Sequence, residues 1–141
     1  MRKRTVLAAA LVVLGAPGCS ATPGAVQQAF ERRYPGMEVE AWERQPYGWE
    51  AGFGGDDGVY EAEFDPSGRW LESEVEVIDA AGFPAAVREA VASATGGRQI
   101  DKWEIEITPD GEFYEVETLG SDGEFYFDPT GRPAANQFED A

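Results

Sequence analysis

Glutamate at every second position is the pattern in this sequence with the clearest chemical potential. Glu72, Glu74 and Glu76 alternate with uncharged residues, and Glu104 and Glu106 do the same further along the chain. Successive side chains of a β-strand point to opposite faces, so each series is predicted to lie on one face of a strand. Carboxyl pairs can transfer protons when a pocket raises the pKa of one member. An open strand face provides no such pocket, so we expect no catalytic residue and no enzyme.

The predicted strand faces instead form an acidic surface open to water. Four further glutamates at alternating positions complete it: Glu61, Glu63, Glu115 and Glu117. Such a surface can attract a basic partner over a long range, or it can serve only solubility and protection against aggregation. Two aromatic residues that alternate with apolar neighbours are expected to be exposed beside it and to act as interface anchors. The candidate partner-binding face therefore consists of Glu72, Glu74, Glu76, Trp70, Glu104, Glu106 and Tyr126.

The composition excludes several classes of function. The chain has 27 acidic and 11 basic residues and a net charge of −16. This charge repels phosphate backbones and anionic lipids, which argues against nucleic-acid binding and against adsorption to a membrane surface. The sequence has no histidine and one cysteine, so it lacks the commonest general base and cannot form an intrachain disulfide or a zinc cluster. We expect no cofactor, and a protein as partner, with a basic one favoured.

Two aspartate-glycine sequences could be interpreted as calcium loops. Asp56-Asp57-Gly58 and Asp122-Gly123 offer carboxylates, but they lack the alternating ligands and the distant glutamate of an EF-hand loop. Asp-Gly is also the ordinary chemistry of a tight turn. We therefore expect turns and no metal ligands. The alternative is an acidic structural or envelope-stress domain that binds cations such as calcium weakly.

Residues 1–19 are typical of an export signal. Basic residues at positions 2–4 precede a short apolar run at positions 6–14, which is too short to span a bilayer as a permanent helix. Small residues then lead to Cys19, which resembles the bacterial lipobox, in which the cysteine becomes acylated. The alternative is an ordinary secretory peptide with an incidental cysteine. Either way we expect an exported protein of the periplasm or cell envelope, anchored through Cys19, with residues 20–22 as a short tether.

The rest of the chain is predicted to contain two copies of one unit, because residues 84–131 repeat the pattern of residues 23–68. The first unit, residues 23–79, begins with a helix that has Thr22 as its cap and Pro23 at its first position. Four strands are expected after it, at 39–43, 49–53, 59–64 and 70–78. The second unit, residues 83–131, has a helix that ends at Gly96-Gly97 and strands at 100–107, 113–119 and 124–127. Residues 132–141 lose the alternation and are expected to be a C-terminal tail, either coil or a frayed edge strand.

The alternation of residue types determines the fold class. Each predicted helix has one apolar stripe, and the strands have one apolar face and one face rich in glutamate. Placing the helices on the apolar face leaves the acidic face to water. The sequence therefore predicts an α+β fold with two tandem repeats of helix and antiparallel sheet, and with both helices packed on one face of the sheet.

Several short motifs resemble a known family. Tyr34-Pro35-Gly36 after the first helix, Trp42 in the first strand, and Phe-Asp-Pro-Ser/Thr-Gly at 64–68 and 127–131 are similar to the PepSY-like secreted bacterial proteins. That group is similar in turn to the β-lactamase inhibitor protein fold, which is built from tandem helix-plus-sheet repeats. The resemblance implies an exported, non-enzymatic module that binds or inhibits another protein. It assigns no binding residues, and the weak fourth strand of the second unit departs from a full eight-stranded sheet.

Overall fold

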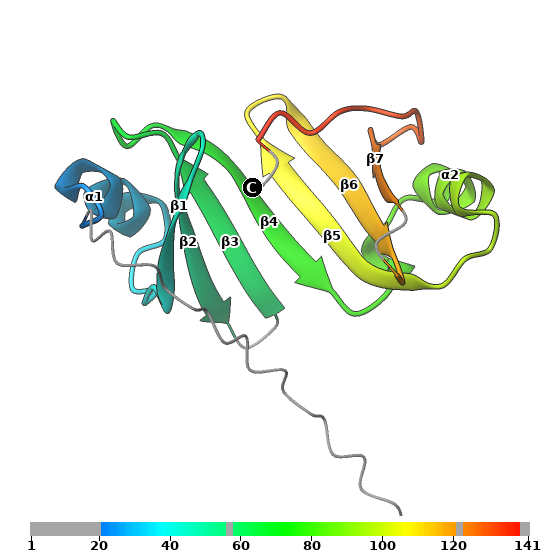
Figure 1. Ribbon diagram of the computed structural model, residues 1–141, viewed down its shortest axis with the longest axis horizontal. Helices are drawn as coiled ribbons and strands as arrows, with labels where there is room; N and C mark the ends of the chain where they lie inside the picture. The colour runs from blue at the N-terminus through cyan, green and yellow to red at the C-terminus, as the bar shows by residue number, and fades with distance from the viewer. Residues whose placement is uncertain (1–20, 56–57, 121–122, 139–141) are drawn as a thin grey trace, which may run out of the picture.

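The computed structural model describes residues 21–55, 58–120 and 123–138, and it contains one antiparallel sheet whose seven strands follow one another in chain order (Figure 1). Their bounds are β1 Ala41–Gln45, β2 Gly48–Gly55, β3 Gly58–Phe64, β4 Trp70–Val77, β5 Ile100–Thr108, β6 Gly111–Thr118 and β7 Glu124–Phe127. The predicted α+β class is confirmed. The strand predictions agree with these bounds to within about two residues, because alternation and turn residues mark most strand ends.

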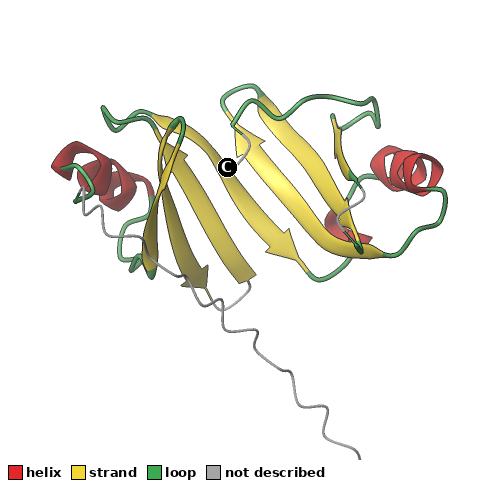
Figure 2. Cartoon of the chain, viewed as in Figure 1, coloured by secondary structure: helices red, strands yellow, loops and turns green. Residues whose placement is uncertain are grey.

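Two α-helices lie near the two ends of the sheet (Figure 2). Helix α1 covers Gly24–Arg33 before β1, and helix α2 covers Ala85–Thr95 between β4 and β5, just after the short 3-10 helix η1, Ala80–Gly82. The predicted Thr22 cap is wrong: Pro23 itself occupies the cap position, and no side chain caps α1. Helix α2 ends as predicted, because Gly96 follows it in the left-handed conformation with φ 61°.

Each helix shares a hydrophobic core with the strands of its own half of the chain. Val26 and Phe30 of α1 pack with Trp49, Phe53 and Phe64, and the Phe30 and Phe53 rings meet edge-to-face with centroids 5.0 Å apart. A second core contains Val87 and Val91 of α2. Its other buried members are Phe83, Tyr114, Val116 and Phe127. The apolar stripes that the sequence predicts are therefore the buried sides of the helices.

The turn after β3 and the turn after β7 position the helices by the same contacts. Asp65 Oδ1 accepts hydrogen bonds from the backbone N–H of Ser67 and Arg69. The glycine between them, Gly68, has φ 87°, and a Cβ there would lie 2.5 Å from the carbonyl oxygen of Ala25 in α1. The second turn repeats these hydrogen bonds and this close approach with Asp128, Thr130, Arg132, Gly131 and Ala86. The repeated motif thus brings turn backbone directly against helix backbone.

The register of the strands places glutamates opposite one another. Glu63 faces Glu72 between β3 and β4, Glu74 faces Glu106 between β4 and β5, and Glu104 faces Glu115 between β5 and β6. A β-bulge at the start of β4 shifts the register, because Phe64 pairs with Trp70 while Glu63 pairs with Glu72, which leaves Leu71 as the extra residue. The bulge places Trp70 opposite Phe64, on the other face of the sheet from Glu72, although the two residues are two positions apart.

The C-terminal segment, residues 132–138, returns across the sheet and contacts both halves of the chain. It leaves β7 through a single β-bridge between Phe127 and Pro133. Asn136 then donates a hydrogen bond from Nδ2 to Glu106 Oε1 at 3.3 Å, and the ring of Phe138 meets that of Tyr47 with centroids 5.8 Å apart. In Figure 1 the segment, in orange and red, runs from β7 back toward β4. Within residues 123–138 it forms no eighth strand.

Candidate functional site: the acidic face of the sheet

The side of the sheet that carries the opposed glutamates is the candidate site, and we call it the acidic face. Its members alternate along strands β2 to β6 with residues of the two cores, so they point away from both cores. They are Glu50, Glu61, Glu63, Glu72, Glu74, Glu76, Lys102, Glu104, Glu106, Glu115 and Glu117. The structure thus brings the glutamates of the predicted partner-binding face together from β4 and β5.

The expectation that the predicted strand glutamates are open to water is wrong for four of them. Glu63, Glu72, Glu104 and Glu106 are 1%, 1%, 5% and 0% exposed. The C-terminal segment lies over this part of the sheet, as the hydrogen bond from Asn136 to Glu106 shows. Of the residues predicted to bind a partner, Glu72, Glu104 and Glu106 are therefore buried, Trp70, Glu74 and Tyr126 are half-buried, and Glu76 is exposed.

Burial changes the charge of this face. Burial, and then the nearby Glu72 carboxylate, raise the pKa of Glu63 to about 10. Burial, and then a hydrogen bond with Glu115, raise the pKa of Glu106 to about 11. Burial likewise raises the pKa of Tyr126, with the adjacent Glu106 as the second cause. At neutral pH, Glu63 and Glu106 consequently hold protons, and the face is less negative than its composition suggests.

Among the described residues that form the acidic face, Lys102 is the one with a basic side chain. Its Nζ lies 2.7 Å from Glu104 Oε1 and 4.0 Å from Glu117 Oε1. Burial lowers the pKa of Lys102, but the hydrogen bond and charge of Glu104 outweigh burial and leave that pKa raised. Burial raises the pKa of Glu104 to about 7 against the opposing effect of Lys102. Near neutral pH, Lys102 therefore stays charged and Glu104 titrates, while Glu63 and Glu106 hold their protons.

A hollow of about 160 Å³ surrounds this ion pair, and we call it the acidic groove. Its lining residues are Glu74, Lys102, Glu104, Glu115, Glu117, Glu124 and Asn136. Five of these seven side chains are carboxyls, and one ammonium group stands among them. The groove can therefore accept hydrogen-bond donors that carry positive charge.

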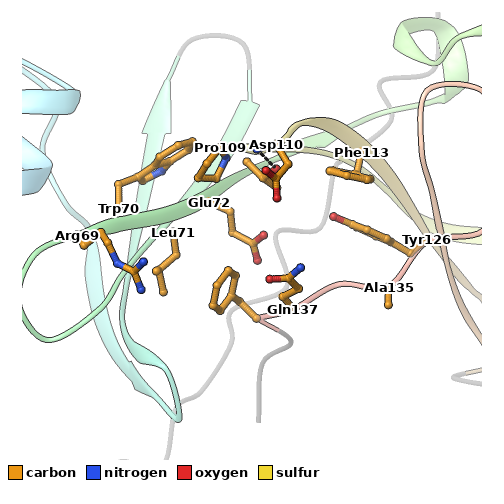
Figure 3. Close-up of a pocket in the computed structure, with 12 residues that line it drawn as sticks. Arg69, Trp70, Leu71, Glu72, Pro109, Asp110, Phe113, Tyr126, Ala135 and Gln137 are labelled. Atoms are coloured by element: carbon orange, nitrogen blue, oxygen red, sulfur yellow. Dashed lines mark hydrogen bonds between the residues drawn. The ribbon is translucent and has the colours of Figure 1, made fainter.

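A second hollow, of about 200 Å³, lies on the other side of the C-terminal segment, and we call it the aromatic cleft (Figure 3). Phe113 and Tyr126 stack along one side with ring centroids 5.2 Å apart, and Trp70 stands on another side. The Glu72 carboxyl points into the space between them. Asn136 lines the groove whereas Gln137 and Phe138 line the cleft, so the C-terminal segment separates the two hollows.

Trp70 is also tied to the first core. Its indole N–H donates to Ser73 Oγ at 2.8 Å, and the Arg33 guanidinium stacks 3.3 Å from its ring centroid. Trp70 thus reaches the aromatic cleft from the opposite side of the sheet to Glu72. Sequence reasoning placed Trp70 beside the acidic surface but missed Phe113 and Phe138. Phe138 gave one usable signal, since it is the only large apolar residue after Phe127.

Three of the expectations from sequence concern residues outside the described part of the chain. These are the export signal, Cys19 with residue 20 of the tether, and the aspartates of the two loops, Asp56, Asp57 and Asp122. Among the residues that are described, no helix has the length and apolar character needed to cross a bilayer.

Comparison with known proteins identifies relatives of this architecture. Residues 49–133 match the family model whose description is "Putative beta-lactamase-inhibitor-like, PepSY-like". This match covers more than half of the chain. It includes the residues that line the acidic groove and the aromatic cleft, except those of the C-terminal segment after residue 133. No curated protein matches the sequence.

Several solved structures with the same fold come from Bacteroides species. A BLIP-like protein from Bacteroides fragilis has 24% sequence identity and a TM-score of 0.70, covering 87% of this chain and 89% of its own. A protein from Bacteroides eggerthii, described as one of the "putative periplasmic proteins", has 19% identity and a TM-score of 0.73, covering 84% and 89%. A DUF2874 family protein from Bacteroides uniformis has 22% identity and a TM-score of 0.71, covering 80% and 86%. At these identities the likeness concerns the fold.

Proposed function

Because this chain belongs to the beta-lactamase-inhibitor-like, PepSY-like family, we propose that it is an exported, non-enzymatic module that binds another protein through its acidic face. The partner presents a lysine or arginine side chain to the acidic groove. The groove is lined on this face by carboxyls from β4, β5, β6 and β7. Inhibition of an enzyme is one form that such binding can take.

The position of Lys102 carries this proposal. Its ammonium group lies 2.7 Å from Glu104 Oε1 and within 4.0 Å of Glu117 Oε1, so the groove already accommodates one basic side chain. Glu74 and Glu115 are half-buried and Glu124 is exposed at the same hollow. One lysine cannot neutralise five carboxyls, so a second cation supplied by a partner is favoured by charge complementarity.

The aromatic cleft supplies the apolar part of the same surface. Trp70 and Tyr126 are half-buried there, and Phe113 stacks on Tyr126. Aromatic side chains beside a charged rim are typical anchors of a protein interface. The buried carboxyls Glu72 and Glu106 lie under this surface and shape it, while Glu74 and Glu76 are accessible to a partner.

A binding surface that spans both halves of the sheet would follow from two tandem units. We propose that residues 23–79 and 83–131 are two copies of one unit, with both helices on the side of the sheet opposite the acidic face. The support is the repeated turn, in which Gly68 approaches Ala25 and Gly131 approaches Ala86 at the same distance of 2.5 Å. Residues 132–141 then form a tail that follows the second unit.

Export through residues 1–19 and acylation of Cys19 belong to this proposal too. The sequence supports them, together with a fold shared with a protein described as periplasmic. A lipid-anchored binding module would present its acidic face to partners at the membrane surface. Metabolic labelling with a palmitate analogue checks the anchor, because label should enter the wild-type chain and be absent from a Cys19→Ala chain.

Capture of partners from a periplasmic extract tests the proposed binding. We expect a specific protein to be retained by the wild-type chain at low salt and released at high salt, because charge attraction is screened. A Glu115→Gln/Glu117→Gln/Glu124→Gln variant should lose it. The matched control is Glu31→Gln/Glu38→Gln/Glu89→Gln, which removes the same charge at exposed positions outside the acidic groove. Equal retention by both variants, or no specific protein at any salt concentration, would refute the proposed role of the groove.

A further inference from the structure

We infer that the C-terminal segment, residues 132–138, occupies the place of a partner on the acidic face, and that the partner displaces it with an extended segment of its own. The partner's segment carries a hydrogen-bond donor at the position of Asn136 and an aromatic ring two residues later, at the position of Phe138. This inference rests on the proposed binding of a protein, under which the donor is the partner's lysine or arginine.

The C-terminal segment is paired with the sheet only at its start. The Ala134 N–H donates a hydrogen bond to the Tyr126 carbonyl oxygen of β7 at 2.9 Å. Beyond Ala134, no backbone group of the described segment forms a hydrogen bond with the sheet. One side-chain hydrogen bond joins this part to the sheet, from Asn136 Nδ2 to Glu106 Oε1, and its 3.3 Å is long for an N–H···O bond. Residues 135–138 can therefore leave the face without breaking any strand pairing.

Two side chains of the segment are its anchors on the face. Asn136 and Phe138 are half-buried, whereas Ala135 and Gln137 are exposed. Asn136 lines the acidic groove, and the Phe138 ring lines the aromatic cleft and meets the Tyr47 ring at 73°. Asn136 Oδ1 also accepts a hydrogen bond from the Phe138 N–H at 2.9 Å, so the first anchor directs the second. The segment thus contacts the face as a bound peptide does, through a few side chains in separate hollows.

The composition of the segment fits a place surrounded by carboxyl groups. Residues 132–138 contain no acidic side chain, although 27 of the 141 residues of the chain are acidic. Asn136 gives the acidic groove a donor without a charge, while five carboxyls line that groove. A lysine or arginine at this position donates the same kind of hydrogen bond and adds a positive charge. A partner's segment with such a residue should therefore bind more tightly than the internal one.

Displacement of the segment joins the two hollows into one surface. The acidic groove and the aromatic cleft, of about 160 and 200 Å³, lie on either side of the segment. In Figure 3, Ala135 and Gln137 form the side of the cleft opposite Trp70. Without this side, one extended segment can contact the carboxyls of the groove and the rings of the cleft together. The internal segment competes with it, because a short tether holds the segment at an effective concentration of about a millimolar.

An NMR titration of the full chain with a capped peptide of residues 132–138 tests the inference. In an Asn136→Ala/Phe138→Ala chain the internal anchors are missing, so the peptide should bind saturably and shift the amide signals of Tyr47, β4 and β5. The wild-type chain should bind the same peptide at least about tenfold more weakly, because its own segment occupies the place. Circular dichroism confirms that the variant chain is folded, and Asn136→Ala alone replaces it if it is not.

Two further peptides show whether the anchors are recognised. A peptide with Asn136→Ala and Phe138→Ala, and a scrambled peptide of the native composition, should each bind the variant chain about tenfold more weakly than the native peptide. Absence of saturable shifts at millimolar peptide, equal affinity of the wild-type and variant chains, or equal affinity of the native and alanine peptides would each overturn the inference.

A peptide with Asn136→Lys separates this inference from the proposed function. Its affinity for the variant chain should exceed that of the native peptide, and the gain should disappear when Glu115→Gln, Glu117→Gln and Glu124→Gln are added to that chain. Binding of the native peptide without a gain from lysine would refute the basic side chain of the proposed function and support the displaced segment. Failure of every peptide, together with capture of a salt-sensitive partner from the extract, would refute the displaced segment alone.

Discussion

At the scale of the residue, the exposure of a glutamate on the acidic face depends on whether the C-terminal segment covers it. Glu76 of β4 and Glu106 of β5 belong to the same alternating pattern on two paired strands. Glu76 is nevertheless exposed, whereas Glu106 is 0% exposed. Burial stabilises Glu106 as a neutral acid. The sequence pattern places both on one face but contains no information about which of them the C-terminal segment covers.

The raised pKa of Glu106 predicts how stability depends on pH. The folded chain keeps this proton up to a pKa of about 11, while the unfolded chain releases it near its ordinary value of 4.5. Between these values the folded state binds more protons, so the free energy of unfolding falls as pH rises. Glu74, Glu115, Tyr126 and Asn136 are the polar groups around it.

Melting temperatures measured from pH 5 to pH 9 check this prediction. The wild-type chain should lose stability steadily over that range, and Glu106→Gln, which mimics the neutral acid, should flatten the profile. An equally steep profile for Glu106→Gln would show that this proton does not cause the loss. Glu112→Gln is the matched control, because it is exposed on β6 and should leave the slope unchanged.

At the scale of the element, the strands could be predicted and the contacts that fix them could not. Alternation with Trp103, Ile105 and Ile107 on one side placed β5, and proline and aspartate marked the turn after it. The bulge at Leu71 has no such signal, because the extra residue preserves an apolar position. The repeated turn motif was visible in sequence, but only the structure shows that its glycine touches the helix.

Gly68→Ala tests that contact. Its φ of 87° is unfavourable for alanine, and the new Cβ would meet the Ala25 carbonyl oxygen, so we expect a loss on the order of 3 kcal/mol in the free energy of unfolding. Gly36→Ala is the control, since φ there is 82° but no atom lies within 4 Å of the new Cβ. Its loss should be about 1 kcal/mol. Equal losses in chemical denaturation would mean that the close approach contributes nothing.

At the scale of the whole molecule, the two cores share a sheet but do not share side chains. Strands β4 and β5 join them by backbone pairing from Ser73–Ile107 to Val77–Trp103. The C-terminal segment is a second connection, because it begins at β7 and ends with Phe138 on Tyr47 in the first half. The sequence predicted the α+β class and the strands of each half, but it could not predict this return, since residues 132–138 have no periodic pattern.

Phe138→Ala should loosen this connection. The half-buried ring packs on Tyr47 and lines the aromatic cleft, so its removal should cost roughly 1–2 kcal/mol and increase the exposure of the glutamates beneath. Hydrogen exchange checks this locally, with faster exchange expected in β4 and β5. Leu119→Ala, an apolar truncation at a 56% exposed position, should leave exchange there unchanged. Unchanged exchange in the Phe138 variant would show that the segment does not protect the face.

The course of the C-terminal segment also orders events as the chain emerges after export. Residues 132–138 emerge after every glutamate that this segment covers. Until then Glu106 lacks Asn136 above it and remains hydrated and ionised, so the sheet emerges with its acidic face at full charge. Glu106 then takes up a proton when the C-terminal segment packs over it. Protonation of Glu106 is therefore part of the last step of folding.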